Sequence, residues 1–180
     1  MKLILSEYGI NETREDILYL RKTIKDTTKL AVRKIMEAGI DQAKLLNSVA
    51  PKTGVEENQI YGTSSKDGYS RQVVMSGPNA IYDEFGTGEE GAADPHPLKS
   101  KFGLNPYNSG PYVSTHVNKN GKHYWFYRPM ASIEPRYFKK SGYTQGTPSG
   151  KQMYNTLRYL EKNKKNIVNE EFNNALNIFR

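Results

Sequence analysis

Three histidines, His96, His116 and His123, are the side chains of this sequence best suited to act as a general base near neutral pH. None has a sequence neighbour that indicates a catalytic pair. Asp94 and His96 flank a proline and offer two metal ligands, but a metal site needs a third and a fourth ligand from elsewhere. We therefore expect no resident metal and no other cofactor.

The adjacent carboxylates of Asp83 and Glu84 are a second candidate for acid–base chemistry. The segment from Asn79 to Phe85 is predicted to be a strand, in which neighbouring side chains point to opposite faces. The two carboxylates would then not act as a pair on one substrate. A hydrolase that uses Glu84 or His123 is a rival interpretation, and it predicts that Glu84→Gln abolishes activity while assembly stays intact.

Two glycine-containing stretches are only superficially similar to phosphate-binding loops. Gly86-Thr87-Gly88 lacks the Lys-Ser/Thr end of a P-loop, and the stretch 146–151 lacks the required spacing before Gly150-Lys151. We expect the first stretch to be a turn. In the second, Ser149 is expected to cap a helix.

The composition excludes several classes of protein. The chain of 180 residues is long enough for one core, and the absence of cysteine excludes disulfides and thiolate chemistry. No apolar run reaches the roughly 18 residues that cross a bilayer, and the charged start does not fit a signal peptide. We therefore expect no membrane contact and a protein that stays in the cytoplasm where it is made.

The formal net charge of +7 is concentrated in the C-terminal part of the chain. Four of these basic residues form a possible contact face: Arg158, Lys162, Lys164 and Lys165. Such a face is able to follow phosphates, but lysines on the outer side of a helix more often serve solvation. A basic nucleic-acid-binding module is therefore a rival to the interpretation that follows.

A long helix is predicted near the N-terminus, after a possible strand at Lys2 to Leu5 and with Thr13 as its cap. Apolar or small residues recur at spacings of three or four from Ile17 to about Asn47, so the pattern predicts one long helix or two collinear ones, with Gly39 as a weak point. This length exceeds what a small core needs, which favours packing of part of the helix on another chain.

The middle of the chain predicts a small antiparallel sheet. Two strands, Val55 to Gly62 and Tyr69 to Ser76, flank Lys66-Asp67-Gly68, whose Asp-Gly pair suits the positive φ angles of a hairpin turn. Asn79 to Phe85 and the aromatic Lys122 to Tyr127 are the third and fourth strands. The Gly/Pro-rich stretch at about 88–121 is expected to project as an inserted loop.

A C-terminal helix is predicted after Ser149, with an apolar stripe from Met153 to Phe179 that Lys164 interrupts. The expected fold is thus α+β, with a long N-terminal helix, a small antiparallel sheet carrying a long inserted loop, and a C-terminal helix. We expect residues 1–180 to form a single domain.

Two short motifs stand at the ends of predicted elements. The first consists of Ala50, Pro51, Thr53 and Gly54, and the second of Tyr82, Glu84, Phe85, Gly86, Thr87 and Gly88. Together with the order of the elements, they resemble the tail-completion or head-tail joining (neck) proteins of long-tailed phages, the family named after gene product ten of a lambda-like phage. The similarity covers roughly Ile17 to Phe179. The chain departs from the family in its longer insertion and in Val55 to Asn58, where members have Leu-Arg-x-Ser.

The resemblance implies a structural virion protein with no reaction and no cofactor. It implies a ring of identical subunits at the head-tail junction, which contacts other neck, connector and tail proteins and leaves a channel for DNA without sequence-specific binding. Under this implication Glu84 orients or neutralises a basic partner, Phe85 anchors packing, and Gly86 and Gly88 let the backbone leave the sheet. A tail terminator or minor tail protein is the alternative within the same setting.

Overall fold

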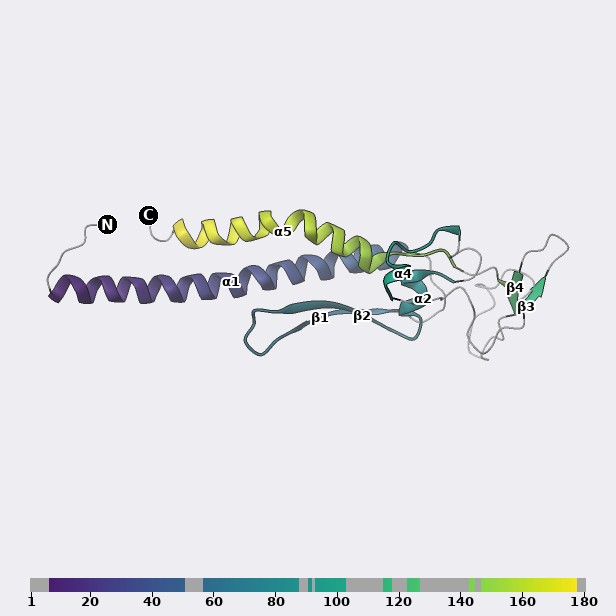
Figure 1. Ribbon diagram of the computed structural model, residues 1–180, viewed down its shortest axis with the longest axis horizontal. Helices are drawn as coiled ribbons and strands as arrows, with labels where there is room; N and C mark the ends of the chain where they lie inside the picture. The colour runs from purple at the N-terminus through teal and green to yellow at the C-terminus, as the bar shows by residue number, and fades with distance from the viewer. Residues whose placement is uncertain are drawn as a thin grey trace. The chain divides into compact units, whose positions relative to one another are not determined.

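The computed structural model describes residues 7–50, 57–87, 91, 93–102, 115–117, 123–126, 143–144 and 147–177 (Figure 1). Its elements are α1 (Glu7–Val49), β1 (Gln59–Ser64), β2 (Arg71–Ser76), α2 (Ala80–Phe85), α4 (Lys99–Phe102), β3 (Thr115–Val117), β4 (His123–Phe126), β5 (Tyr143–Thr144) and α5 (Gln152–Leu176). The fold is therefore α+β, with a long N-terminal helix, a small two-stranded antiparallel sheet and a C-terminal helix, as the sequence predicts.

The helix α1 is continuous over 43 residues, so the alternative of two collinear helices is wrong. It begins at Glu7, and Thr13 lies inside it, where the Thr13 hydroxyl donates to the carbonyl of Gly9 (2.7 Å). Thr13 is therefore not the N-cap. The helix ends at Val49, directly before Ala50-Pro51, where the sequence predicts its end. The possible strand at Lys2 to Leu5 lies outside the described residues.

The chain divides into two compact units. Unit 1 comprises residues 1–40, 62–73 and 158–180, and unit 2 comprises residues 41–61 and 74–157. The single domain expected from the sequence remains a prediction.

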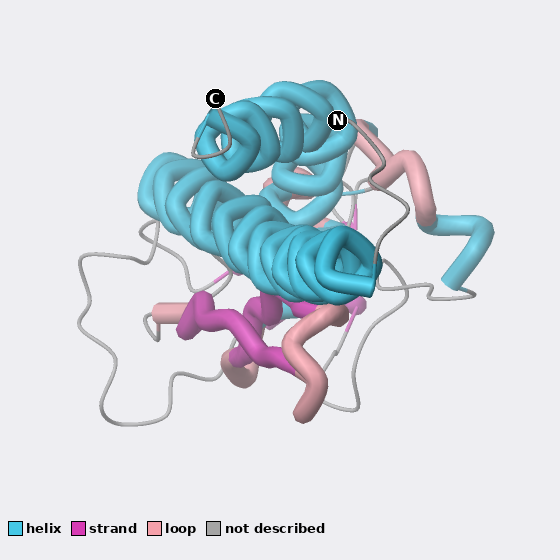
Figure 2. The backbone as a smooth tube through the Cα atoms, turned by 90° about the vertical axis from the view of Figure 1, so that its left-hand side faces the viewer, coloured by secondary structure: helices cyan, strands magenta, loops and turns pink. Residues whose placement is uncertain are grey.

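In unit 1, α1 lies between α5 and the β1–β2 hairpin (Figure 2). A Cβ atom on Gly39 would lie 2.9 Å from Val73 Cγ2 and 3.0 Å from Leu160 Cδ1. Gly39 is therefore a point of close packing for both neighbours of α1, and a side chain is missing there because none fits. Among the described residues of α1 in this unit, Ala31 is a buried apolar one.

The hairpin of β1 and β2 confirms the predicted pair of strands. Its loop is closed by Ser65 N donating to Ser70 O (2.8 Å), and Asp67 accepts hydrogen bonds from the Ser65 hydroxyl and from Tyr69 N. Gly68 has a φ of 78°, whereas Asp67 does not adopt a positive φ. The expected pair of positive φ angles is thus wrong at Asp67, because the longer loop needs only one.

A second antiparallel sheet has the strand order β3-β4-β5. The aromatic strand is present as β4, and Trp125 pairs with Thr115 on one side and with Thr144 on the other. The sequence predicts that this strand belongs to the same small sheet as the hairpin. It instead pairs with β3, which lies inside the stretch predicted as a loop, and with β5. The surroundings of the aromatic side chains of β4 are not described.

The third predicted strand is wrong, because Ala80–Phe85 forms α2. Its buried residues Ala80, Asp83 and Glu84 follow helical spacing, and Phe85 is buried next to them, whereas Ile81 and Tyr82, which have high strand propensity, are exposed. Burial of two hydrogen-bonded carboxylates thus overrides local strand propensity. The motif ends a helix and not a strand.

Candidate functional site

The end of α2 and the start of α5 are joined by backbone hydrogen bonds within unit 2. Thr87 and Thr147 each donate their N–H group to the other's carbonyl (2.8 and 3.2 Å). Further along, Gly150 N donates to Asp83 O (2.9 Å), and Lys151 N donates to Glu84 O (3.1 Å). This ladder brings the second sequence motif against the N-terminus of α5.

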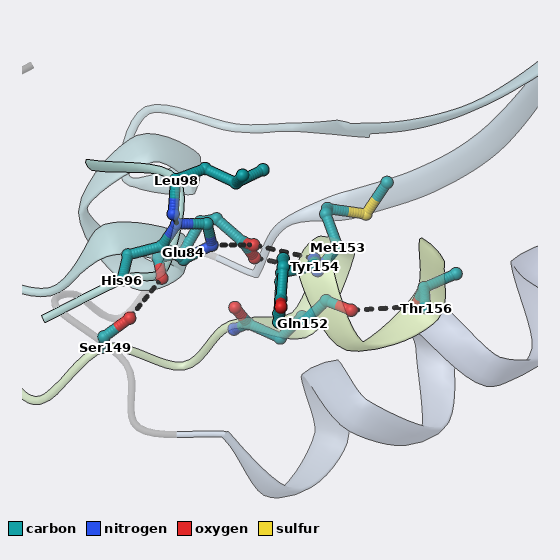
Figure 3. Close-up of polar contacts among 8 residues, drawn as sticks. All are labelled: Glu84, His96, Leu98, Ser149, Gln152, Met153, Tyr154 and Thr156. Carbon is teal, nitrogen blue, oxygen red and sulfur yellow. Dashed lines mark hydrogen bonds and ion pairs between the residues drawn. The ribbon is translucent and has the colours of Figure 1, made fainter. Parts of the chain in front are cut away.

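Glu84 caps α5 with its side chain. Its Oε2 accepts the N–H group of Met153 (2.8 Å) and its Oε1 accepts that of Tyr154 (2.9 Å), as Figure 3 shows. These N–H groups belong to the first turn of the helix and have no partner within it. Because the helix N-terminus carries positive partial charge, it stabilises a carboxylate that is only 7% exposed.

Gln152 completes the ring of donors around this carboxylate. The side chain is fully buried, and its amide faces two acceptors; we assign the amide nitrogen to this side, where it donates to Glu84 Oε2 (3.1 Å) and to Asp83 O (3.2 Å). The Ser149 hydroxyl donates to the backbone carbonyl of Glu84 (2.8 Å). Ser149 is therefore not the helix cap expected from the sequence; Glu84, which comes from another element, has that role.

His96 closes the other side of Glu84. The Nδ1 atom of His96 accepts the N–H group of Leu98 (3.0 Å), so that nitrogen carries no proton and the ring proton is on Nε2. Nε2 lies 3.0 Å from Glu84 Oε1 and donates to it (Figure 3). The ring also packs against Phe85 at 4.2 Å and edge-on against Tyr154 at 5.4 Å between centroids.

Asp83 is the second buried carboxylate, with an exposed fraction of 1%. Its Oδ2 accepts the amide N–H of Asn58 (2.7 Å), a residue that directly precedes β1. The adjacent acids of α2 therefore turn to different partners, one towards the hairpin and one towards α5. The sequence predicts that the two carboxylates do not form a pair, and they do not. The predicted cause was a strand with alternating side chains, whereas the two acids lie on a helix and bind different partners.

This arrangement has the chemistry of a structural polar cluster. Both ring nitrogens of His96 are engaged, and the Ser149 hydroxyl donates to a backbone carbonyl and not to His96, so the three residues do not form a nucleophile, base and acid relay. Within the described residues no group of three or more His, Asp and Glu side chains is placed to hold a metal ion. Asp94, the other ligand considered, pairs with Lys151.

The residues of the second motif differ in burial and in backbone conformation. Phe85 is buried and Tyr82 is exposed. The role of Phe85 as a packing anchor in the assembly stays a prediction. Gly86 has φ 76° and ψ 172°, and it lets the backbone turn at the end of a helix, not of a sheet. Within this chain the partners of Glu84 are helix N–H groups, an amide and a histidine, and its expected role towards a basic partner stays a prediction. Gly88 lies outside the described residues.

The first motif is described only at Ala50, whose N–H group donates to Leu46 O (3.0 Å). Pro51, Thr53 and Gly54 lie outside the described residues. The first part of the expected projecting loop returns to the site, because His96 is 4% exposed and Gly91 N donates to Thr87 O (2.9 Å). The side chains of His116 and His123 are not described.

The basic residues of α5 are all exposed, but they do not share one face. Since successive helical residues turn by about 100°, Arg158, Lys162 and Lys165 lie on one side and Lys164 lies about 120° away from Arg158. Arg158 also pairs with Glu161 (2.8 Å). The possible contact face is therefore a row of three cations, one of them partly neutralised.

The polar partners of Asp83 and Glu84 were not predicted from the sequence, because the contacts join segments far apart in the chain. These partners are Asn58, His96 and Gln152. The Tyr154–Glu84 hydrogen bond, for example, spans 70 residues. Comparison with protein-family models, curated proteins and solved structures gives no match. Among the described helices none is both long and apolar enough to cross a membrane.

Proposed function

We propose that this chain is a structural subunit of the head-tail connection of a long-tailed phage, located in the virion and assembled as a ring that leaves a channel for DNA. The proposal begins with the two motifs that resemble the tail-completion and neck proteins. The observation that carries it is the capping of α5 by Glu84, the central acid of the second motif.

The hydrogen-bond partners of Glu84 come from its own chain. Its carboxylate oxygens accept hydrogen bonds from Met153, Tyr154 and His96, all in the same unit of the same chain. A hydrolytic carboxylate has to reach a substrate, whereas this one is buried and surrounded by donors. The motif thus serves to join α2 to α5, a role suited to a subunit whose work is assembly.

The test is the assembly state of the purified chain, measured by native mass spectrometry and by negative-stain electron microscopy. We expect a closed cyclic oligomer, because ring subunits contact their neighbours through heterologous surfaces around a rotation axis. A strict monomer that also fails to join heads to tails in a complementation assay overturns the proposal.

A matched pair of variants separates a structural from a catalytic Glu84. Glu84→Gln is expected to reduce ring formation, since it removes the charge that stabilises the start of α5. Glu37→Gln, which alters an exposed i,i+4 pair with Arg33, is expected to assemble normally. If Glu84→Gln assembles as the unaltered chain does and loses a hydrolytic activity, the rival hydrolase interpretation is correct.

A tail terminator or minor tail protein differs from a neck protein only in the neighbouring ring that it contacts. Cryo-electron microscopy of the particle distinguishes them by the position of the subunit. Density between the head connector and the tail top supports the neck, and density at the end of the tail tube or lower supports the alternative.

A further inference from the structure

The first half of α1 carries apolar side chains that the rest of unit 1 leaves exposed. Ile17, Leu20 and Ile24 are 55%, 40% and 46% exposed. They continue, at alternating spacings of three and four, into Thr27 and Ala31, which are 6% and 3% exposed. A row with this spacing is the a/d seam of a coiled coil, in which Ile occupies a positions and Leu a d position.

The helix α5 is too short to cover this seam. Leu160 lies opposite Gly39, at 3.0 Å from a Cβ placed there, and the two helices run in opposite directions (Figure 1). The last residue of α5, Leu176, is 16 residues beyond Leu160 and therefore reaches the level of Thr23, 16 residues before Gly39. Ile17 and Leu20 thus lie beyond the level that α5 reaches, and Ile24, close to that level, is still 46% exposed.

The charges that flank the seam indicate what covers it. Asp16 occupies a g position and Arg21 the e position five residues later, and both are exposed. In the described part of the chain neither takes part in an ion pair. When two such helices lie parallel, each g residue faces the e residue of the other helix five positions on, so that Asp16 faces Arg21. An antiparallel pair instead brings g beside g and e beside e.

We infer that the α1 seam of Ile17, Leu20 and Ile24 binds a second copy of this chain, with the two α1 helices parallel and Asp16 of one copy paired with Arg21 of the other. The row of apolar side chains supplies the area, and the charges set the direction. This contact needs only α1 and does not rest on the proposed phage function.

The first test compares two neighbouring leucines by sedimentation equilibrium over a range of concentrations. Leu20→Ser removes a seam residue and is expected to weaken self-association at least about tenfold. Leu18→Ser is the matched control, because Leu18 is 52% exposed on the opposite side of the same helix, and it is expected to associate like the unaltered chain. Circular dichroism checks that both variants stay helical.

The second test exchanges the charges. Asp16→Arg and Arg21→Asp each place like charges together and are expected to weaken association severalfold, while the double variant restores it. An unaltered chain that is monomeric at every concentration, or a Leu20→Ser chain that associates normally, overturns the inference. A double variant that stays weak overturns the parallel pairing.

The two proposals fail in different ways. If Leu20→Ser forms the closed ring and also associates in sedimentation as tightly as the unaltered chain, the α1 contact is wrong and the proposed function stands. If the unaltered chain forms charge-dependent α1 pairs but no ring, the α1 contact stands and the proposed function is wrong.

Discussion

Glu84 is a charged residue in a buried position, a combination that costs free energy unless each oxygen is hydrogen-bonded. Here the donors are two helix N–H groups, the amide of Gln152 and the ring of His96. The sequence identifies Glu84 as important through its motif, but it gives the wrong reason, because the acid acts on a helix seventy positions later in the chain. The role of Glu84 is to join α2 to the start of α5.

Replacement of Glu84 by Gln is expected to destabilise the protein by about 2 kcal/mol, because charge-assisted hydrogen bonds at a helix N-terminus are lost and an amide N–H group then faces other N–H groups. For a chain of this size, that corresponds to a fall in Tm of about 4–8 °C. Thermal unfolding followed by circular dichroism measures it. A Tm unchanged to within a degree contradicts the capping role.

The pairing of His96 with Glu84 is expected to appear as energetic coupling. In a double-mutant cycle of Glu84→Gln and His96→Ala, the cost of the second change should fall by about 1 kcal/mol once the first has been made. Urea unfolding of the four proteins gives this value. Strict additivity would mean that the 3.0 Å contact contributes nothing of its own.

Asp67 gives the hairpin a pH dependence. The hydrogen bond from the Ser65 hydroxyl, aided by that from Tyr69 N, lowers the pKa of the Asp67 carboxyl below its ordinary value of 3.8. Because the folded-state pKa is the lower one, this contribution to stability is present above the unfolded-state pKa and is lost as the pH falls towards the folded-state pKa.

The expected result is that Asp67→Asn costs stability at pH 7 and progressively less as the pH falls below about 4. Unfolding of both chains at a series of pH values tests this. A difference between the two that grows on acidification contradicts the sign.

At the scale of the elements, the two long helices and the hairpin were predictable because each has a strong local signal. The α1 pattern repeats over many turns, and Asp67-Gly68 marks the hairpin loop. The short α2 was not predictable, since Ile81 and Tyr82 have high strand propensity and two of the four residues that it buries are carboxylates. A helix of 6 residues is specified by its tertiary partners, which local sequence does not contain.

The turn that ends α2 gives a matched pair of glycines for a test. Gly86 and Gly68 have nearly the same φ, 76° and 78°. A Cβ on Gly86 would meet backbone atoms of Ser149 and Thr147 at 2.7 and 2.8 Å, whereas one on Gly68 would meet the Lys29 side chain at 3.6 Å. The two positions share a positive φ and differ in their surroundings.

Gly86→Ala is therefore expected to cost about 3 kcal/mol or more, and Gly68→Ala only about 1 kcal/mol. The first change forces apart the strand-like ladder between residues 87 and 147, and the second strains one exposed loop. Chemical denaturation measures both. Equal costs would show that the ladder does not restrict Gly86.

At the scale of the whole molecule, the net charge of +7 raises the question of whether this protein holds DNA. The exposed cations of α5 that share a side are Arg158, Lys162 and Lys165, and Arg158 already pairs with Glu161. If each of these three cations contacts one phosphate, log K for duplex DNA falls against log salt with a slope of only about 3. A face of this size steers anions but does not bind tightly.

We expect weak binding of duplex DNA in low salt, with that shallow slope, in a fluorescence anisotropy titration. Lys162→Glu should lower the slope by about one, and Lys164→Glu, on another side of α5, should change it less. Neither should alter assembly, because both residues are exposed. A slope of six or more that Lys162, Lys164 and Lys165 changes to Glu abolish together would instead identify a nucleic-acid-binding module, since so many released ions require a surface wider than this row.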